Sequence, residues 1–121
     1  MEVLPERPRV IVCLRSPAEV VASTLRYYGL EGDEASAAVE HTWRCEYERL
    51  IEIIDAHALD AMCVEYGQLV ADPDAAIVRL ERFVGRKLGG AGVRRDLKHH
   101  AAPVPADFAA LYARVAALGK A

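Results

Sequence analysis

The chain has 121 residues, which is the length of one domain and enough to bury a moderate hydrophobic core. Its apolar fraction of 53% and charged fraction of 27% are typical of a soluble globular protein. The net charge of −3 argues against general binding to nucleic acid, which normally requires a basic surface. No stretch approaches the roughly 20 apolar residues of a membrane span, so we expect no membrane partner.

Cysteine usage and the amino terminus indicate the compartment. Cys13, Cys45 and Cys63 are an odd number of cysteines, and two of them lie in predicted strands, which argues against a disulfide framework. We therefore predict buried free thiols in a reducing compartment. Residues 1–8 form a polar lead-in without the apolar segment of a signal peptide, so we expect the protein in the cytoplasm.

The first predicted elements are a strand and a helix that follows it directly. Val10–Leu14 is a short apolar run rich in β-branched residues, which predicts a parallel strand buried on both faces. Ser16 is suited to the N-cap of the helix and Pro17 to its first position. Glu19 completes the pattern of a capping box, S-P-A-E. The helix is expected to end near Gly29.

Arg15 lies between this strand and this helix. It is therefore predicted at the carboxyl end of a strand, beside free backbone N–H groups and the positive end of a helix dipole. An arginine at such a place favours binding of a phosphate group. The alternative is an ordinary strand–turn–helix unit of an α/β protein with an arginine at the turn.

A long second helix is predicted from about Glu34 to His57, with Asp33 or Ser36 as its cap. Its apolar residues recur at the spacing of one helical face. The members of this stripe are Val39, Trp43, Tyr47, Leu50 and Ile54. His41 and Cys45 share another face at i and i+4, but two ligands without a third are weak support for a metal, so we predict no metal site.

The remainder of the chain adds a second strand and further helices. Ala61–Tyr66 reads as a strand parallel to the first, because a helical crossover joins them. A loop is predicted at Gly67–Asp72, followed by a helix at Pro73–Val84 that Asp72 caps and Gly85 ends. A last helix starts at Pro105. The fold class is thus α/β, a single domain over residues 1–121 with two parallel strands and about four helices.

The order of Arg15, Pro17 and Ser23 gives the pattern R-x-P-x-x-x-x-x-S after an apolar strand. This pattern resembles the 3′-phosphate-binding segment of sulfotransferases that use 3′-phosphoadenosine 5′-phosphosulfate (PAPS). The resemblance implies that Arg15 and Ser23 hold the 3′-phosphate of PAPS or of its product, adenosine 3′,5′-bisphosphate (PAP).

A second stretch, VEYGQLVADPDAAIVRLERFVGRKL, resembles the family pattern V-x-Y-E-D-L-x-x-D-P followed by a helix that ends in F-L-G or F-V-G. The resemblance implies that Tyr66 lies against the adenine, on the sheet edge that also holds Arg15. Gly67 and Gln68 replace the usual Glu-Asp of the pattern. The alternative for Tyr66 is a core tyrosine at the end of the sheet.

The chain resembles only the C-terminal half of the partial three-layer, P-loop-like sulfotransferase fold. In the family, the loop that cradles the 5′-phosphosulfate and the general base both precede the arginine motif. No such residues precede Val10, so the catalytic residues stay unknown and we expect the isolated chain to be inactive. The basic cluster at Arg94–Lys98 is a further candidate for contact with a phosphate.

The resemblance predicts a sulfotransferase-family protein that contributes the 3′-phosphoadenosine side of the PAPS site, for sulfuryl transfer to a hydroxyl or amine. The alternatives are a non-catalytic module that binds an adenine nucleotide and a helical protein-interaction module. Because Val10–Leu14 is too apolar for an exposed edge strand, we also expect a homodimer or a complex with an N-terminal sulfotransferase half.

Overall fold

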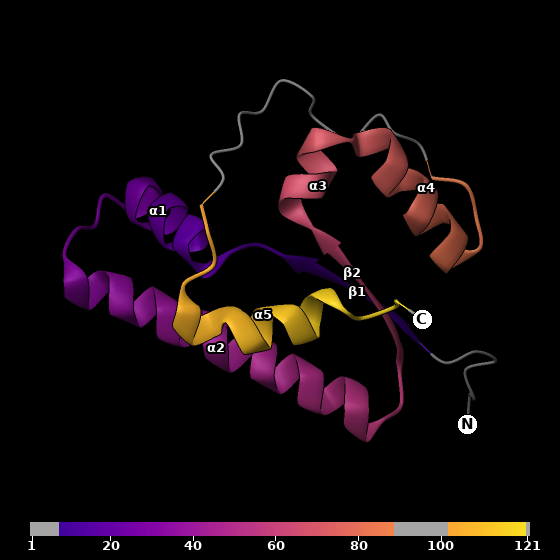
Figure 1. The fold of residues 1–121 in the computed structure, drawn as a ribbon, viewed down its shortest axis with the longest axis horizontal. Coiled ribbons are helices and arrows are strands. Elements are labelled where there is room, and N and C mark those ends of the chain that lie inside the picture. The colour runs from indigo at the N-terminus through magenta and orange to yellow at the C-terminus, as the bar shows by residue number, and fades with distance from the viewer. Residues whose placement is uncertain (1–7, 89–101, 121) are drawn as a thin grey trace, which may run out of the picture.

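The computed structural model describes residues 8–88 and 102–120 and has an α/β fold in which helices dominate (Figure 1). The elements in chain order are β1 (Arg9–Leu14), α1 (Pro17–Tyr28), α2 (Asp33–Ala56), β2 (Asp60–Glu65), α3 (Tyr66–Ala71), α4 (Pro73–Val84), a 3-10 turn (Ala106–Phe108) and α5 (Ala109–Ala116). The predicted class, with two parallel strands, is confirmed. Within the described residues, none of the helices has both the length and the apolarity that a membrane span requires.

The loop predicted at Gly67–Asp72 is wrong, because a short helix, α3, occupies Tyr66–Ala71. Leu69 and Val70 give this helix a half-buried apolar side, and it packs against α4 and β2. A helix of this length is unstable alone and depends on such packing, which a local sequence pattern does not reveal. The described part of the chain therefore has five α-helices rather than about four.

The two strands pair in parallel over six residue pairs, from Arg9 opposite Asp60 to Leu14 opposite Glu65. Both strands therefore end at the same edge of the sheet, and Arg15 and Tyr66 follow directly. This register places the segment that follows β1, with Arg15, beside the segment that follows β2, with Tyr66.

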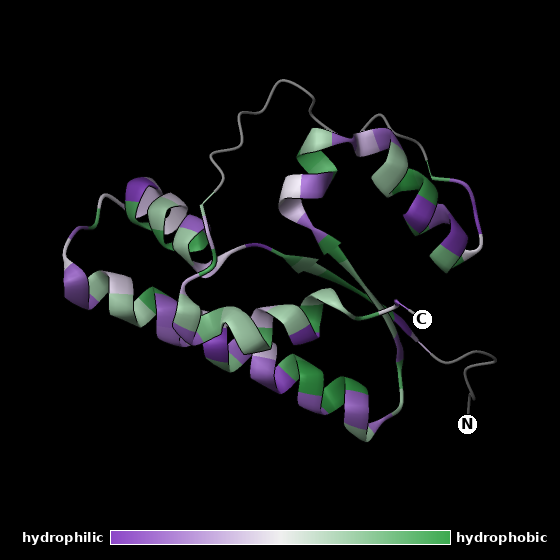
Figure 2. Ribbon diagram, viewed as in Figure 1, coloured by the Kyte–Doolittle hydropathy of each residue, from purple (hydrophilic) through white to green (hydrophobic). Residues whose placement is uncertain are grey.

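One face of the sheet packs against α2 and α5 and forms the hydrophobic core. Its buried members are Val12, Leu14, Trp43, Ile51, Ile54, Ala61, Cys63, Phe108 and Val115. The ribbon of α5 and parts of the ribbon of α2 are coloured as apolar in Figure 2, and these two helices contribute to this core. The predicted apolar stripe of α2 is confirmed, because Trp43 and Ile54 are buried and Tyr47 packs against the core.

The prediction that β1 is buried on both faces is wrong. Val12 and Leu14 are buried, but Ile11 is 42% exposed and Cys13 is exposed as well. On this second face the described helices cover β2, where Met62 and Val64 are buried, more completely than β1. An apolar residue at every position of a strand thus does not require cover on both sides.

The observed helix caps match the caps predicted from the sequence in part. Asp72 caps α4, accepting a hydrogen bond at Oδ1 from the backbone N–H of Ala75 at 3.2 Å. Gly29 ends α1 in the left-handed conformation, as expected. The predicted cap of α2 is wrong, since Gly32 takes the N-cap position and no side chain bonds there.

All three cysteines are free, as predicted, but the prediction that all are buried is wrong for two of them. Cys13 and Cys45 are exposed, whereas Cys63 is 2% exposed in the core. Burial, and next the nearby Glu65 carboxylate, raise the pKa of the Cys63 thiol from 9.0 to about 11.

This shift predicts that the free energy of unfolding falls as pH rises from 9 to 11. The unfolded chain loses the Cys63 proton near pH 9, whereas the folded chain keeps it until about pH 11, so alkali favours unfolding in this window. Urea unfolding at increasing pH measures the slope. Cys63→Ala should reduce this slope without abolishing it, because the pKa values of Tyr47 and Tyr112 are raised as well. An equal slope in both proteins would contradict the assignment to Cys63.

The turn after α5 closes against the backbone of β2. The N–H of Cys63 donates to the carbonyl of Leu118 at 3.2 Å. Gly119, at φ +77°, follows so closely that a Cβ atom there would lie 2.8 Å from Met62 Cβ and 2.9 Å from Ala61 O. Both the positive φ and the contact require glycine at this position.

We expect Gly119→Ala to lower the free energy of unfolding by about 2–4 kcal/mol. The loss has two causes, because alanine is strained in the left-handed conformation and its Cβ atom would overpack against β2. Gly29→Ala is the matched control, because Gly29 has φ +66° and no described atom within 4 Å of the added Cβ. It should cost only about 1–2 kcal/mol. Urea denaturation measures both, and equal losses would show that Gly119 does not approach β2.

Candidate functional site

Two residues predicted from separate motifs meet at the carboxyl edge of the sheet. The guanidinium carbon of Arg15, after β1, lies 4.4 Å from the ring centroid of Tyr66, after β2. This is the geometry of a cation–π contact. The predicted convergence of Arg15 and Tyr66 on one edge is therefore confirmed.

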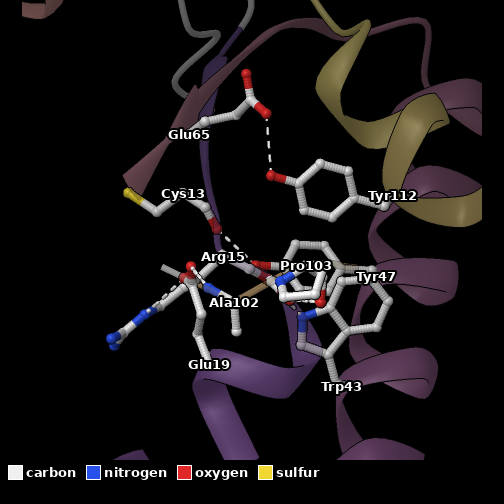
Figure 3. Close-up of polar contacts among 10 residues, drawn as sticks. Cys13, Arg15, Glu19, Trp43, Tyr47, Glu65, Ala102, Pro103 and Tyr112 are labelled. Atoms are coloured by element: carbon white, nitrogen blue, oxygen red, sulfur yellow. Dashed lines mark hydrogen bonds and ion pairs between the residues drawn. The ribbon is translucent and has the colours of Figure 1, made fainter. Parts of the chain in front are cut away.

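Glu19 holds Arg15 from the first turn of α1. The Nε of Arg15 donates to Oε2 of Glu19 at 3.3 Å, and the backbone N–H of Ala102 donates to Oε1 at 3.0 Å (Figure 3). Glu19 is 7% exposed, and these two hydrogen bonds offset the cost of burying its carboxylate. The capping box predicted for Ser16 and Glu19 is wrong, because the Ser16 hydroxyl instead donates to the carbonyl of Pro103 at 3.3 Å.

Two aromatic side chains of α2 fix the backbone that precedes α1. The indole Nε1 of Trp43 donates to the carbonyl of Arg15 at 3.0 Å. The hydroxyl of Tyr47 donates to the carbonyl of Cys13 at 2.6 Å, and burial raises the pKa of Tyr47 to about 12. Both donors lie beside the backbone from Cys13 to Arg15 (Figure 3), so α2 helps to determine where Arg15 leaves the strand.

A pocket of about 210 Å³ opens beside Arg15. It is lined by Leu14, Arg15, Ser16, Glu19, Glu65, Gly67, Gln68, Ala102, Val104 and Tyr112. The hydroxyl of Tyr112 donates to Oε1 of Glu65 at 2.9 Å, and burial, followed by this bond, raises the pKa of Tyr112. The charged lining groups are therefore one guanidinium and two carboxylates.

Sequence reasoning missed Glu65 and Tyr112 as site residues. Glu65 is the last residue of β2, and its place at the carboxyl edge was a usable signal. Tyr112 lies among the apolar residues of α5, and nothing local in the sequence indicates that its hydroxyl reaches β2.

Ser23, the third predicted site residue, is not brought together with the other two. It lies on α1 one turn beyond Glu19 and is half-buried. Among the described residues it does not belong to the lining of this pocket. The basic cluster at Arg94–Lys98 lies outside the described residues.

A larger cavity, of about 420 Å³, lies between α1 and α2. Its lining contains one ionisable carboxylate, Glu46, together with Trp43 and Tyr47, whose polar atoms already bond to the β1–α1 backbone. The carboxyl edge instead combines charged groups from both strand ends and α1. Ligands of open α/β sheets bind at this edge, which makes it the stronger candidate.

No protein-family model matches the chain, and no curated protein and no solved structure matches it either.

Proposed function

We propose that the carboxyl edge of β1 and β2 binds the 3′-phosphoadenosine part of PAPS or PAP, in the manner of a sulfotransferase-family protein. The observation that supports this proposal most strongly is the 4.4 Å approach of Arg15 to the Tyr66 ring. Two motifs that resemble the family at separate places in the sequence contribute one residue each to this contact.

Arg15 retains guanidinium amino groups that can donate hydrogen bonds to a phosphate. Glu19 accepts from Nε, and the terminal amino groups of the guanidinium extend away from that carboxylate in Figure 3. These amino groups can donate to a phosphate near the first turn of α1, where the helix dipole also favours an anion. The resemblance also implies a contact from Ser23, but Ser23 is not part of the pocket lining beside Arg15, so we assign the phosphate to Arg15 alone.

The adenine stacks on the aromatic and guanidinium surface that Tyr66 and Arg15 form together. The carboxylate of Glu65 accepts a hydrogen bond from a ribose hydroxyl in the neighbouring pocket. Glu19 and Glu65 repel a bisphosphate, however, so we expect affinity to depend strongly on Arg15.

The proposal assigns this chain only the nucleotide side of sulfuryl transfer to a hydroxyl or amine. Transfer further requires donors around the sulfuryl oxygens and a base for the acceptor, and we assign neither role to a residue of this chain. In the proposed enzyme they come from an additional sulfotransferase segment. The free thiols agree with the reducing cytoplasm as the proposed location.

The test is a calorimetric titration with PAP and, separately, with adenosine 5′-monophosphate. We expect PAP to bind more tightly, because only PAP has the 3′-phosphate that Arg15 would hold. Equal affinity for the two nucleotides would contradict the proposal.

A second candidate function is a protein-interaction module. The exposed Ile11 and Cys13 on one face of β1 favour it, because that face offers apolar contact to another chain. A homodimer or an N-terminal sulfotransferase half as the partner stays a prediction. A chain that associates stably and binds neither nucleotide would favour this second function.

A further inference from the structure

The exposed side of α2 brings a thiol and an imidazole together, away from the carboxyl edge of the sheet. Sγ of Cys45 lies 3.5 Å from Nε2 of His41, one helical turn earlier, and both side chains are exposed. In a tetrahedral zinc site with ordinary bond lengths, a sulfur and a nitrogen ligand lie about 3.5–3.6 Å apart. The two atoms thus have the separation of two ligands to one metal ion.

Within residues 8–88 and 102–120, one chain supplies too few ligands for a closed site. Structural zinc normally has four protein ligands. Among the described residues, no group of three or more His, Cys, Asp or Glu side chains could hold a metal ion. A second copy of the chain, related by a twofold axis, would offer an identical Cys45 and His41 and complete the set.

The surroundings of the pair suit such a contact. Ala37 and Ala38 lie one turn before it, exposed and small, so that another helix can approach closely. The helix sequence of α2 contains seven acidic and two basic residues, which attract a cation. The charge of a bound ion would offset part of the repulsion between two acidic helices.

We propose that His41 and Cys45 bind a soft divalent ion, with Zn²⁺ the ion best suited, and that the ion joins two copies of the chain through their α2 helices. The ligand set is two thiolates and two imidazoles, which tetrahedral zinc accepts. The sequence predicted no metal because the i and i+4 pattern supplies only two ligands, and here the partner copy supplies the other two. This site is independent of the proposed nucleotide function.

The test is a titration of the chain with Co²⁺ and then Zn²⁺ in a non-thiol reductant, followed by absorption and sedimentation. We expect the visible bands of tetrahedral Co²⁺ with sulfur-to-cobalt charge transfer, saturating at one ion per two chains. Zn²⁺ should displace the Co²⁺ and maintain a dimer, which a chelator returns to monomer. Saturation at one ion per chain without association would overturn the proposal.

Matched variants locate the site. Cys45→Ser and His41→Gln should each lower the metal affinity at least about 10- to 100-fold, since even loss of an outer partner costs this much. Cys13→Ser removes the other exposed thiol and should leave binding unchanged. A double variant, His99→Gln with His100→Gln, controls for histidines outside the described residues. Charge-transfer bands that persist in Cys45→Ser would overturn the proposal.

Discussion

Replacing Trp43 with alanine should lower the free energy of unfolding by about 3–5 kcal/mol, a large part of a small domain's stability. Trp43 is 3% exposed, and its ring centroid lies 4.7 Å from that of Tyr47 and 5.5 Å from that of Phe108. The substitution leaves a cavity between α2, the 3-10 turn and the sheet. Urea unfolding monitored by circular dichroism measures the loss.

Trp43→Phe separates packing from hydrogen bonding in this prediction. Phenylalanine retains most of the apolar surface but loses the Nε1 donor to the Arg15 carbonyl. We expect this loss to cost about 1–3 kcal/mol, the penalty for one buried group left unsatisfied. A loss as large as that of Trp43→Ala would show that packing against Phe108 contributes little.

Replacing Arg15 with alanine should remove most of the preference for PAP over adenosine 5′-monophosphate. A hydrogen bond to a charged group contributes about 1.5–3 kcal/mol, so we expect PAP affinity to fall about 10- to 150-fold. Binding of the monophosphate should change much less, because it lacks the 3′-phosphate. Calorimetry with both nucleotides measures the change in preference.

Arg9→Ala is the matched control, because Arg9 lies at the opposite end of β1. Its guanidinium donates to the carbonyls of Phe83 and Val84 at the end of α4, at 3.1 and 3.2 Å. The variant removes the same charge from the chain but should leave nucleotide preference unchanged. An equal loss of PAP affinity in both variants would indicate that net charge, rather than the position of Arg15, governs binding.

The sequence predicted the elements whose signals are local. Some signals specify an element or its end within a few residues. They are the apolar run at Val10–Leu14, the helix cap Asp72, and the glycines that end helices, Gly29 and Gly85. The parallel pairing followed from the long crossover helix. These features were sufficient to place Arg15 and Tyr66 on one edge.

Features that depend on long-range contacts were not predictable. Glu19 belongs to a capping-box pattern, yet its carboxylate pairs with Arg15. The same carboxylate accepts a hydrogen bond from the backbone N–H of Ala102, which lies far along the chain. The hydroxyl of Tyr112 reaches Glu65 only because α5 crosses the sheet. The exposure of Ile11 and Cys13 likewise depends on which elements cover β1. The apolar run at Val10–Leu14 does not indicate which elements these are.

The most direct measurement of the central claim is the location of PAP on the folded chain. NMR chemical shifts of backbone amides and arginine side chains, followed during a titration with PAP, report it residue by residue. We predict the largest changes at the Arg15 Nε–H, at the first turn of α1 and at Tyr66. Changes centred instead on the cavity between α1 and α2, around Thr42, or no changes at any PAP concentration, would contradict a nucleotide site at the carboxyl edge of the sheet.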